Sequence, residues 1–215
     1  MRKSCRAFLL LVFMGLSAGS LSAELLDLVP PNQAVAGTSQ AEWSRRWWQW
    51  AVSFDDADSP VADRTGDKCR LKQEGSVWFL AGTYGTKRTI RTCTVPGGKY
   101  LFFPLVNYVV FPRGDAKQSS CESLLRTAKE MTDEVASLVL DLNGLRATGL
   151  EAHRQATADC FDLGARMVPR VHALPAAANG YYVMLKPLPP GKYELNFGGI
   201  LPSMIQAVTY HLVVQ

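Results

Sequence analysis

Proton transfer is the first chemistry that the polar residues of this sequence suggest, because imidazole and carboxylate groups exchange protons near neutral pH. None of these residues falls in an HExxH pair, a P-loop or a dinucleotide-binding glycine box. His211 alternates with Tyr210 and Leu212 in an apolar run, which is typical of a structural histidine. A secreted hydrolase with a site built by loops is therefore the alternative hypothesis. Its candidate residues are His153, His172, His211, Asp55, Asp56, Asp159, Asp162, Asn107 and Tyr108.

Stacking and charge recognition are the second possibility, and their residues are concentrated in the run AEWSRRWWQWAVSFDD, residues 41–56. Flat apolar ligands such as sugar rings stack on exposed tryptophan. Trp48 is the best candidate platform, with Arg45 on its side of the helix. Arg46, Asp55 and Asp56 are the further candidate ligand contacts. The structural alternative is that Trp48 packs against a second layer of the fold. The sequence thus favours a ligand-binding or protein-interaction module over an enzyme.

A helix over residues 39–54 is expected to position these side chains. Ser39 and Glu42 have the spacing of a capping box, which satisfies backbone donors in the first turn. On a helical wheel the aromatic residues of one stripe lie within about 60° of one another, so this face requires a core. Arg46 is three residues from Trp43 and four from Trp50, which predicts stacking of its guanidinium on those rings. The stripe consists of Trp43, Trp47, Trp50 and Phe54.

Four cysteines follow the N-terminal segment: Cys69, Cys93, Cys121 and Cys160. An even number in an exported chain predicts two disulfides, and three pairings are possible. Pairing in sequence order is favoured because it closes the shorter loops. The spacing lacks CxxC and the three histidines are far apart, so no metal or other cofactor is expected.

Residues 1–23 have the features of a secretory signal peptide: basic residues, the apolar run 8–16, and small residues ending at Ala23. The apolar run is too short to cross a bilayer, which needs about 20 residues, and no transmembrane segment is expected in the mature chain. Of the 23 basic residues, three lie in this segment and none of the 19 acidic ones does, leaving a net charge of +1. That charge gives no support for nucleic-acid binding. Residues 24–215 are therefore expected to form one exported domain, periplasmic or extracellular.

The rest of the chain predicts a mainly β fold. Residues 77–85, 89–98 and 99–112 are expected to form an antiparallel group, with 99–112 as a central strand covered on both faces. Asn143-Gly144 predicts a type I′ hairpin, CFDLG at 160–164 a short strand, and 168–179 a loop. Ser119 and Glu122 predict a second helix over 119–136. The acidic segment 55–67 is interpreted as a solvated loop rather than a calcium site. A β-sandwich of immunoglobulin-like or jelly-roll-like form, with two added helices, accommodates these elements.

Five blocks of the sequence resemble a family of uncharacterised exported bacterial proteins. They are WSRRWWQWA, VWFLAGTYG, CTVPGGKYLFFP, LPPGKY and the TGDKC segment, and they span most of the chain after residue 23. The resemblance implies a bacterial origin, export and a shared fold. It implies no activity, so the expected partner stays a small molecule, a glycan or an envelope protein.

Overall fold

The computed structural model describes residues 26–84, 87–112, 119–166 and 175–215, so the predicted signal peptide, residues 1–23, lies outside the described residues. Within these ranges, ten strands form two sheets of five strands each. In the first sheet the order is β1-β3-β8-β6, and β7 also pairs with β8. Its strands are β1 (Val77–Phe79), β3 (Tyr100–Val110), β8 (Pro175–Leu185), β6 (Arg154–Ala156) and β7 (Phe161–Asp162).

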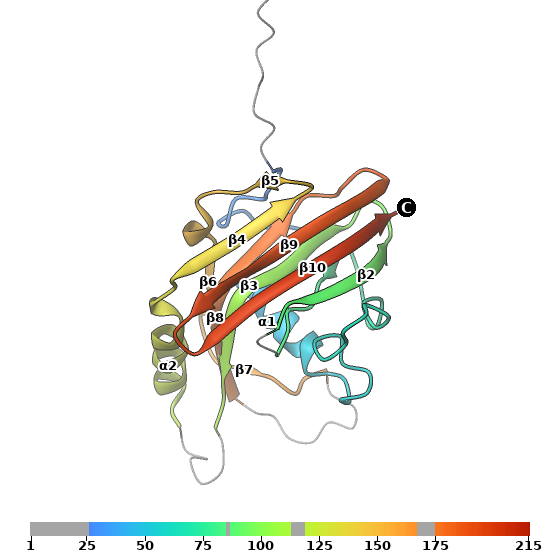
Figure 1. Cartoon of the computed structure of the whole chain (residues 1–215). Helices are drawn as coiled ribbons and strands as arrows, with labels where there is room; N and C mark the ends of the chain where they lie inside the picture. The colour runs from blue at the N-terminus through green and yellow to red at the C-terminus, as the bar shows by residue number, and fades with distance from the viewer. Residues whose placement is uncertain (1–25, 85–86, 113–118, 167–174) are drawn as a thin grey trace, which may run out of the picture.

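The second sheet has the order β2-β10-β9-β4-β5. Its strands are β2 (Thr89–Val95), β10 (Met204–Val214), β9 (Gly191–Leu201), β4 (Ser137–Leu142) and β5 (Leu145–Arg146). In Figure 1 this sheet lies at the front and the first sheet behind it. Apolar side chains from both sheets, among them Phe103 and Phe197, form a buried cluster between them. The predicted β-sandwich is therefore confirmed.

The helix α1 (Gln40–Ala51) covers the other face of the first sheet and creates a second buried cluster there. Ser39 caps it as predicted, accepting a hydrogen bond from the Glu42 backbone N–H at 3.2 Å. The predicted extension to Phe54 is wrong by one turn, because the Ser53 backbone N–H bonds to the Trp50 carbonyl and closes a tighter turn. Covered by α1 on one face and the second sheet on the other, β3 is the predicted central strand.

The helix α2 (Cys121–Asp133) packs on β8 through Leu124, Ala128 and Ala177. Its predicted bounds need correction at both ends. Ser120 rather than Ser119 is the N-cap, since its hydroxyl accepts from the Ser123 backbone N–H. The helix ends before residue 136, because the chain there already bonds to β9 at the start of β4. Between β6 and the hairpin lies one short 3-10 helix, η1 (Leu150–His153).

The strand pairing differs from the antiparallel group that was expected. β1 pairs with β3 in parallel, and β2 pairs with β10 in parallel in the other sheet. The turn at 96–98 therefore carries the chain from one sheet to the other. A Pro-Gly-Gly turn specifies a change of direction but not which sheet the next strand joins. Residues 175–179, expected in a loop, belong to β8, where Ala176, Ala177 and Ala178 are small enough to be fully buried; residues 168–174 of that prediction lie outside the described residues.

Several local predictions are confirmed. Asn143 and Gly144 have φ of 53° and 85°, as a type I′ turn between β4 and β5 requires. CFDLG contains β7. The disulfides are Cys69–Cys93, which ties the acidic loop to β2, and Cys121–Cys160.

The acidic loop is held by its own hydrogen bonds. The Asp63 carboxylate accepts from the backbone N–H groups of Thr65, Gly66 and Lys68 at 2.8 to 2.9 Å. Burial opposes ionisation of Asp63, but these bonds outweigh it and lower its pKa. Asp63 therefore orders the loop, and the loop covers the exposed edge of β2 through the bond from the Thr92 N–H to the Thr65 carbonyl.

Candidate functional site

Two of the predicted binding residues, Arg45 and Arg46, lie on the solvent side of α1. Both guanidinium groups bond to the same oxygen of Glu42, with Arg46 Nε at 3.1 Å. The predicted stacking is confirmed on one ring, since the Arg46 guanidinium carbon lies 4.8 Å from the centre of the Trp43 ring. Both arginine side chains are about two-fifths exposed, 40% and 41%. They are thus oriented by neighbours and still accessible to a ligand.

These arginines open onto a cleft of about 430 Å³ between α1 and the segment that leads into β1. This volume lies within the range of roughly 300 to 1,000 Å³ usual for small-molecule sites. The rings of Trp43 and Phe79 form the apolar part of its base. Gln49 forms the polar part, and its amide nitrogen donates to the Asp162 carbonyl at 2.9 Å. We call it the arginine cleft. Its lining consists of Trp43, Arg45, Arg46, Gln49, Lys72, Glu74, Gly75, Phe79 and Arg166.

Lys72 and Arg166 bring the other two cations to the arginine cleft. The Lys72 ammonium donates to the Ser53 carbonyl and lies 4.5 Å from the centre of the Phe54 ring. Arg166 pairs with Glu74. Four cations therefore share two carboxylates, Glu42 and Glu74, which leaves a surplus of positive charge at a partly exposed site. Sequence reasoning missed both residues, because they are 20 or more positions from α1 and only the fold places them beside it.

The expectation of an exposed platform at Trp48 is wrong. Trp48 is 8% exposed, and its indole N–H donates to the Tyr182 hydroxyl at 2.9 Å. The helical wheel placed Trp48 off the aromatic stripe, but Phe161 and Leu163 from the segment around β7 belong to the same buried cluster and enclose that side of α1. The alternative, packing against a second layer, is what the structure contains.

Asp55 and Asp56 do not join the arginines. Both are exposed in the loop after α1, and Asp55 lines a separate pocket of about 200 Å³. Lys72 lines this pocket as well as the arginine cleft, so the two share a wall. Within the described part of the chain, no ion pair links either aspartate to Arg45 or Arg46.

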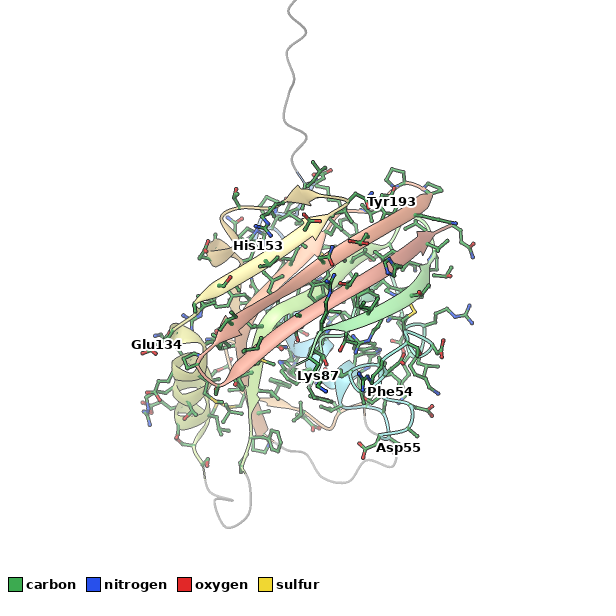
Figure 2. All side chains as sticks on the ribbon, in the orientation of Figure 1. Phe54, Asp55, Lys87, Glu134, His153 and Tyr193 are labelled. Atoms are coloured by element: carbon green, nitrogen blue, oxygen red, sulfur yellow. A yellow bond between two sulfur atoms is a disulfide. The ribbon has the colours of Figure 1, made fainter. Side chains whose placement is uncertain are left out.

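The candidate proton-transfer residues are scattered. Figure 2 shows His153 and Asp55 at opposite sides of the molecule. Asn107 is buried and donates to the Tyr182 hydroxyl, Tyr108 bonds to Ser203, and His211 lies 3.9 Å from Glu194 on the open face of the second sheet. His172 lies outside the described residues, while Asp159 lines a pocket of about 220 Å³ on the far side of Arg45. In the described ranges no hydrogen bond joins a histidine to a serine, threonine or cysteine.

His153 makes stability depend on pH. It is 7% exposed, its Nδ1 has no hydrogen-bond partner among the described residues, and burial lowers its pKa from the usual 6.5. The folded chain binds this proton less readily than the unfolded chain. The contribution of neutral His153 to the free energy of unfolding is therefore complete above pH 6.5. It is lost as the pH falls from 6.5 toward the folded-state pKa of this imidazole.

We expect His153→Gln to reduce the loss of unfolding free energy between about pH 7.5 and about pH 5.5. Urea denaturation at the two pH values measures this difference. The matched control is His211→Gln, which removes an exposed imidazole on the open face of the second sheet. An equal effect of both variants would contradict the assignment to His153.

Comparisons with known proteins identify no relative of this chain. No model of a protein family matches the chain, and no match is found among curated proteins or among solved structures. None of the described helices is long and apolar enough to cross a membrane. The described ranges also contain no group of three or more histidine, cysteine, aspartate or glutamate side chains arranged to hold a metal ion.

Proposed function

We propose that this chain is an exported binding protein whose arginine cleft takes a small polyanion, such as an anionic glycan. The observation that carries the proposal is the cluster of four cations, Arg45, Arg46, Lys72 and Arg166, around a cleft with room for a ligand of disaccharide size. Guanidinium groups recognise sulfate, phosphate and carboxylate through paired hydrogen bonds. The shared feature of the ligand is therefore clustered anionic oxygens.

Preorganisation supports the proposal. Glu42 fixes two guanidinium groups and Trp43 supports one of them from below, so little side-chain entropy is lost on binding. Trp43 and Phe79 are largely buried, at 8% and 5% exposed, and form a rigid apolar base beneath the guanidinium groups. Export is supported by the signal-peptide features of residues 1–23 and by two disulfides, which persist in oxidising compartments.

Calorimetric titration with sucrose octasulfate tests the proposal, with sucrose as the neutral control. We expect saturable binding of the sulfated sugar only, weakened by roughly 0.5 M NaCl because salt screens exposed charges. Arg46→Gln is expected to weaken binding about tenfold, the loss typical of one charge-assisted contact. A second probe, inorganic tripolyphosphate, distinguishes a need for the sugar body from a need for charge alone.

The matched control is Arg126→Gln. Arg126 is an exposed arginine on α2 whose distance to Glu122 is 4.0 Å, and it lies outside the arginine cleft. Its replacement removes the same charge and should leave the affinity unchanged. Equal losses in the two variants would mean that the protein attracts polyanions by net charge alone, and the proposed site would be abandoned.

A further inference from the structure

A second hollow lies on the outer face of the β2-β10-β9-β4-β5 sheet, the face turned away from the sandwich core. In Figure 1 this face is toward the viewer and no helix covers it. The hollow has a volume of about 520 Å³ and crosses β10, β9 and β4. We call it the cross-strand trough. It shares no lining residue with the arginine cleft.

The floor of the cross-strand trough is a row of small residues. Val139, Gly198 and Ala207 are direct partners in the pairing of β4, β9 and β10. A Cβ atom at position 198 would lie only 2.0 Å from the Gln206 carbonyl oxygen of the neighbouring strand. Glycine is therefore required there by the close approach of the two backbones, and the depression is built into the sheet.

One wall of the cross-strand trough is aliphatic. Ile200 and Ile205 are direct partners across β9 and β10, and they are 41% and 49% exposed. The strip that they form continues onto the apolar floor. The lining contains no outward aromatic ring, since Phe197 is buried in the core, so sugar stacking is not favoured here.

The opposite wall is polar and cationic. Arg88 donates to the Thr209 hydroxyl at 2.7 and 3.0 Å and to the Asn196 side-chain oxygen at 3.0 Å, which fixes its guanidinium beside the floor. Arg146 on β5 is the cross-strand neighbour of Asp141 on β4, and both residues line the trough. Among the described residues no carboxylate oxygen lies within 4.0 Å of either guanidinium, and two arginines face one lining carboxylate, Asp141, so this wall carries net positive charge.

We propose that the cross-strand trough binds a linear aliphatic carboxylate, with its chain on Ile200, Ile205 and the small-residue floor and its carboxylate at Arg88 and Arg146. An apolar strip next to unpaired guanidinium groups matches this amphiphile in both parts. A floor of small residues leaves room for the chain to lie flat across the strands. The inference is independent of the polyanion proposal, because the two sites are on opposite layers and are tested with different variants.

The test is a titration of decanoate, below its micelle concentration, followed by calorimetry and by amide chemical shifts. We expect saturable binding that is stronger than that of octanoate, by up to about fourfold for each added CH₂. Decyltrimethylammonium has the same chain and the opposite charge, and it should bind at least tenfold more weakly. Equal affinity for the two amphiphiles would overturn the proposal.

Three variants locate the binding. Ala207→Phe fills the floor and is expected to weaken decanoate binding at least tenfold, and Arg146→Gln several-fold. Val213→Phe is the matched control, because residue 213 is on the same strand and face but outside the lining. Losses as large in Val213→Phe as in Ala207→Phe would contradict the assignment.

Vesicles separate a free ligand from a membrane surface. Phosphatidylglycerol vesicles offer the same negative charge and apolar chains packed in a bilayer. Binding to these vesicles without binding to monomeric decanoate would make the face a membrane contact and would overturn the proposal. Binding to monomeric decanoate with loss in Ala207→Phe supports it.

Discussion

Replacement of Arg91 with methionine is expected to lower the free energy of unfolding by about 4 kcal/mol or more. Arg91 is 1% exposed, and its guanidinium donates to the carbonyls of Asp63, Ala81, Gly82 and Val61 at 2.8 to 3.0 Å. Methionine keeps the apolar part of the side chain but has no donor, so the carbonyls of Asp63, Gly82 and Val61 lose this partner, while that of Ala81 keeps the Tyr210 hydroxyl at 3.3 Å. Each buried group left unpaired costs about 1 to 3 kcal/mol, and the effects of neighbouring groups do not add fully.

The expected loss has a structural consequence beyond stability. The four carbonyls belong to the acidic loop and to the segment after β1, so Arg91 joins both to the second sheet. Tyr210 completes the cluster, with its hydroxyl 3.2 Å from Arg91 Nη1. Its burial raises the pKa of Tyr210, which therefore stays neutral beside the cation. In Arg91→Met, hydrogen exchange of the loop amides should accelerate more than that of β9.

Urea denaturation of Arg91→Met and of Arg64→Met measures the effect. Arg64 is exposed in the same loop, and its replacement should change stability by no more than about 0.5 kcal/mol. Arg91→Lys keeps the charge but offers one nitrogen in place of three, so an intermediate loss is expected. If Arg91→Met were as stable as Arg64→Met, the carbonyls would have found other partners and the account would fail.

Local patterns predicted the elements of this protein better than their pairing. The N-cap at Ser39, the Asn143-Gly144 turn and the apolar run of β3 each depend on residues close in sequence, and each of these was confirmed. The parallel pairing of β2 with β10 depends on residues more than 100 positions apart. Local hydrophobic pattern and turn chemistry carry no information on such a partner.

In the candidate sites, too, local sequence predicts single residues but not which distant residues lie beside them. Arg45 and Arg46 could be predicted as surface residues from the helical wheel, whereas Lys72 and Arg166 join them only through the fold. Trp48 was misplaced because a wheel shows the faces of one helix but not what covers each face. The cross-strand trough was missed altogether, since its floor of Val139, Gly198 and Ala207 comes from three strands.

Gly180→Ala is expected to lower the free energy of unfolding by about 3 kcal/mol or more, at the upper end of the cost of overpacking. Gly180 is the direct partner of Asn107 in the pairing of β8 with β3. A Cβ atom at 180 would lie 2.5 Å from Asn107 Cβ and 2.6 Å from the Val106 carbonyl oxygen. Two of the atoms near this Cβ, Asn107 Cα and the Val106 carbonyl oxygen, belong to the backbone of β3. The strands β3 and β8 must therefore move apart to make room for the methyl group.

That separation reaches Trp48 through hydrogen bonds. The Asn107 amide donates to the Tyr182 hydroxyl at 3.0 Å, and the same hydroxyl accepts from Trp48 Nε1. Burial holds the pKa of Tyr182 well above its usual value, so the hydroxyl stays neutral and keeps both bonds. We expect Gly180→Ala to shift tryptophan emission to longer wavelength as water reaches this cluster, in addition to lowering the denaturation midpoint.

Gly97→Ala provides the matched control, because the nearest atom to a Cβ there is the Gln215 carbonyl oxygen at 3.7 Å, an ordinary contact. Alanine at 97 should be neutral or stabilising by up to about 1 kcal/mol, since it restricts the unfolded chain. Equal losses in the two variants would show that the cost does not come from the restricted space at position 180. A large loss confined to Gly180→Ala, with the red-shifted emission, would instead establish that the Asn107 side chain occupies the space that a Cβ at position 180 would need. It would also show that this close contact between β3 and β8 keeps Trp48 inside the core.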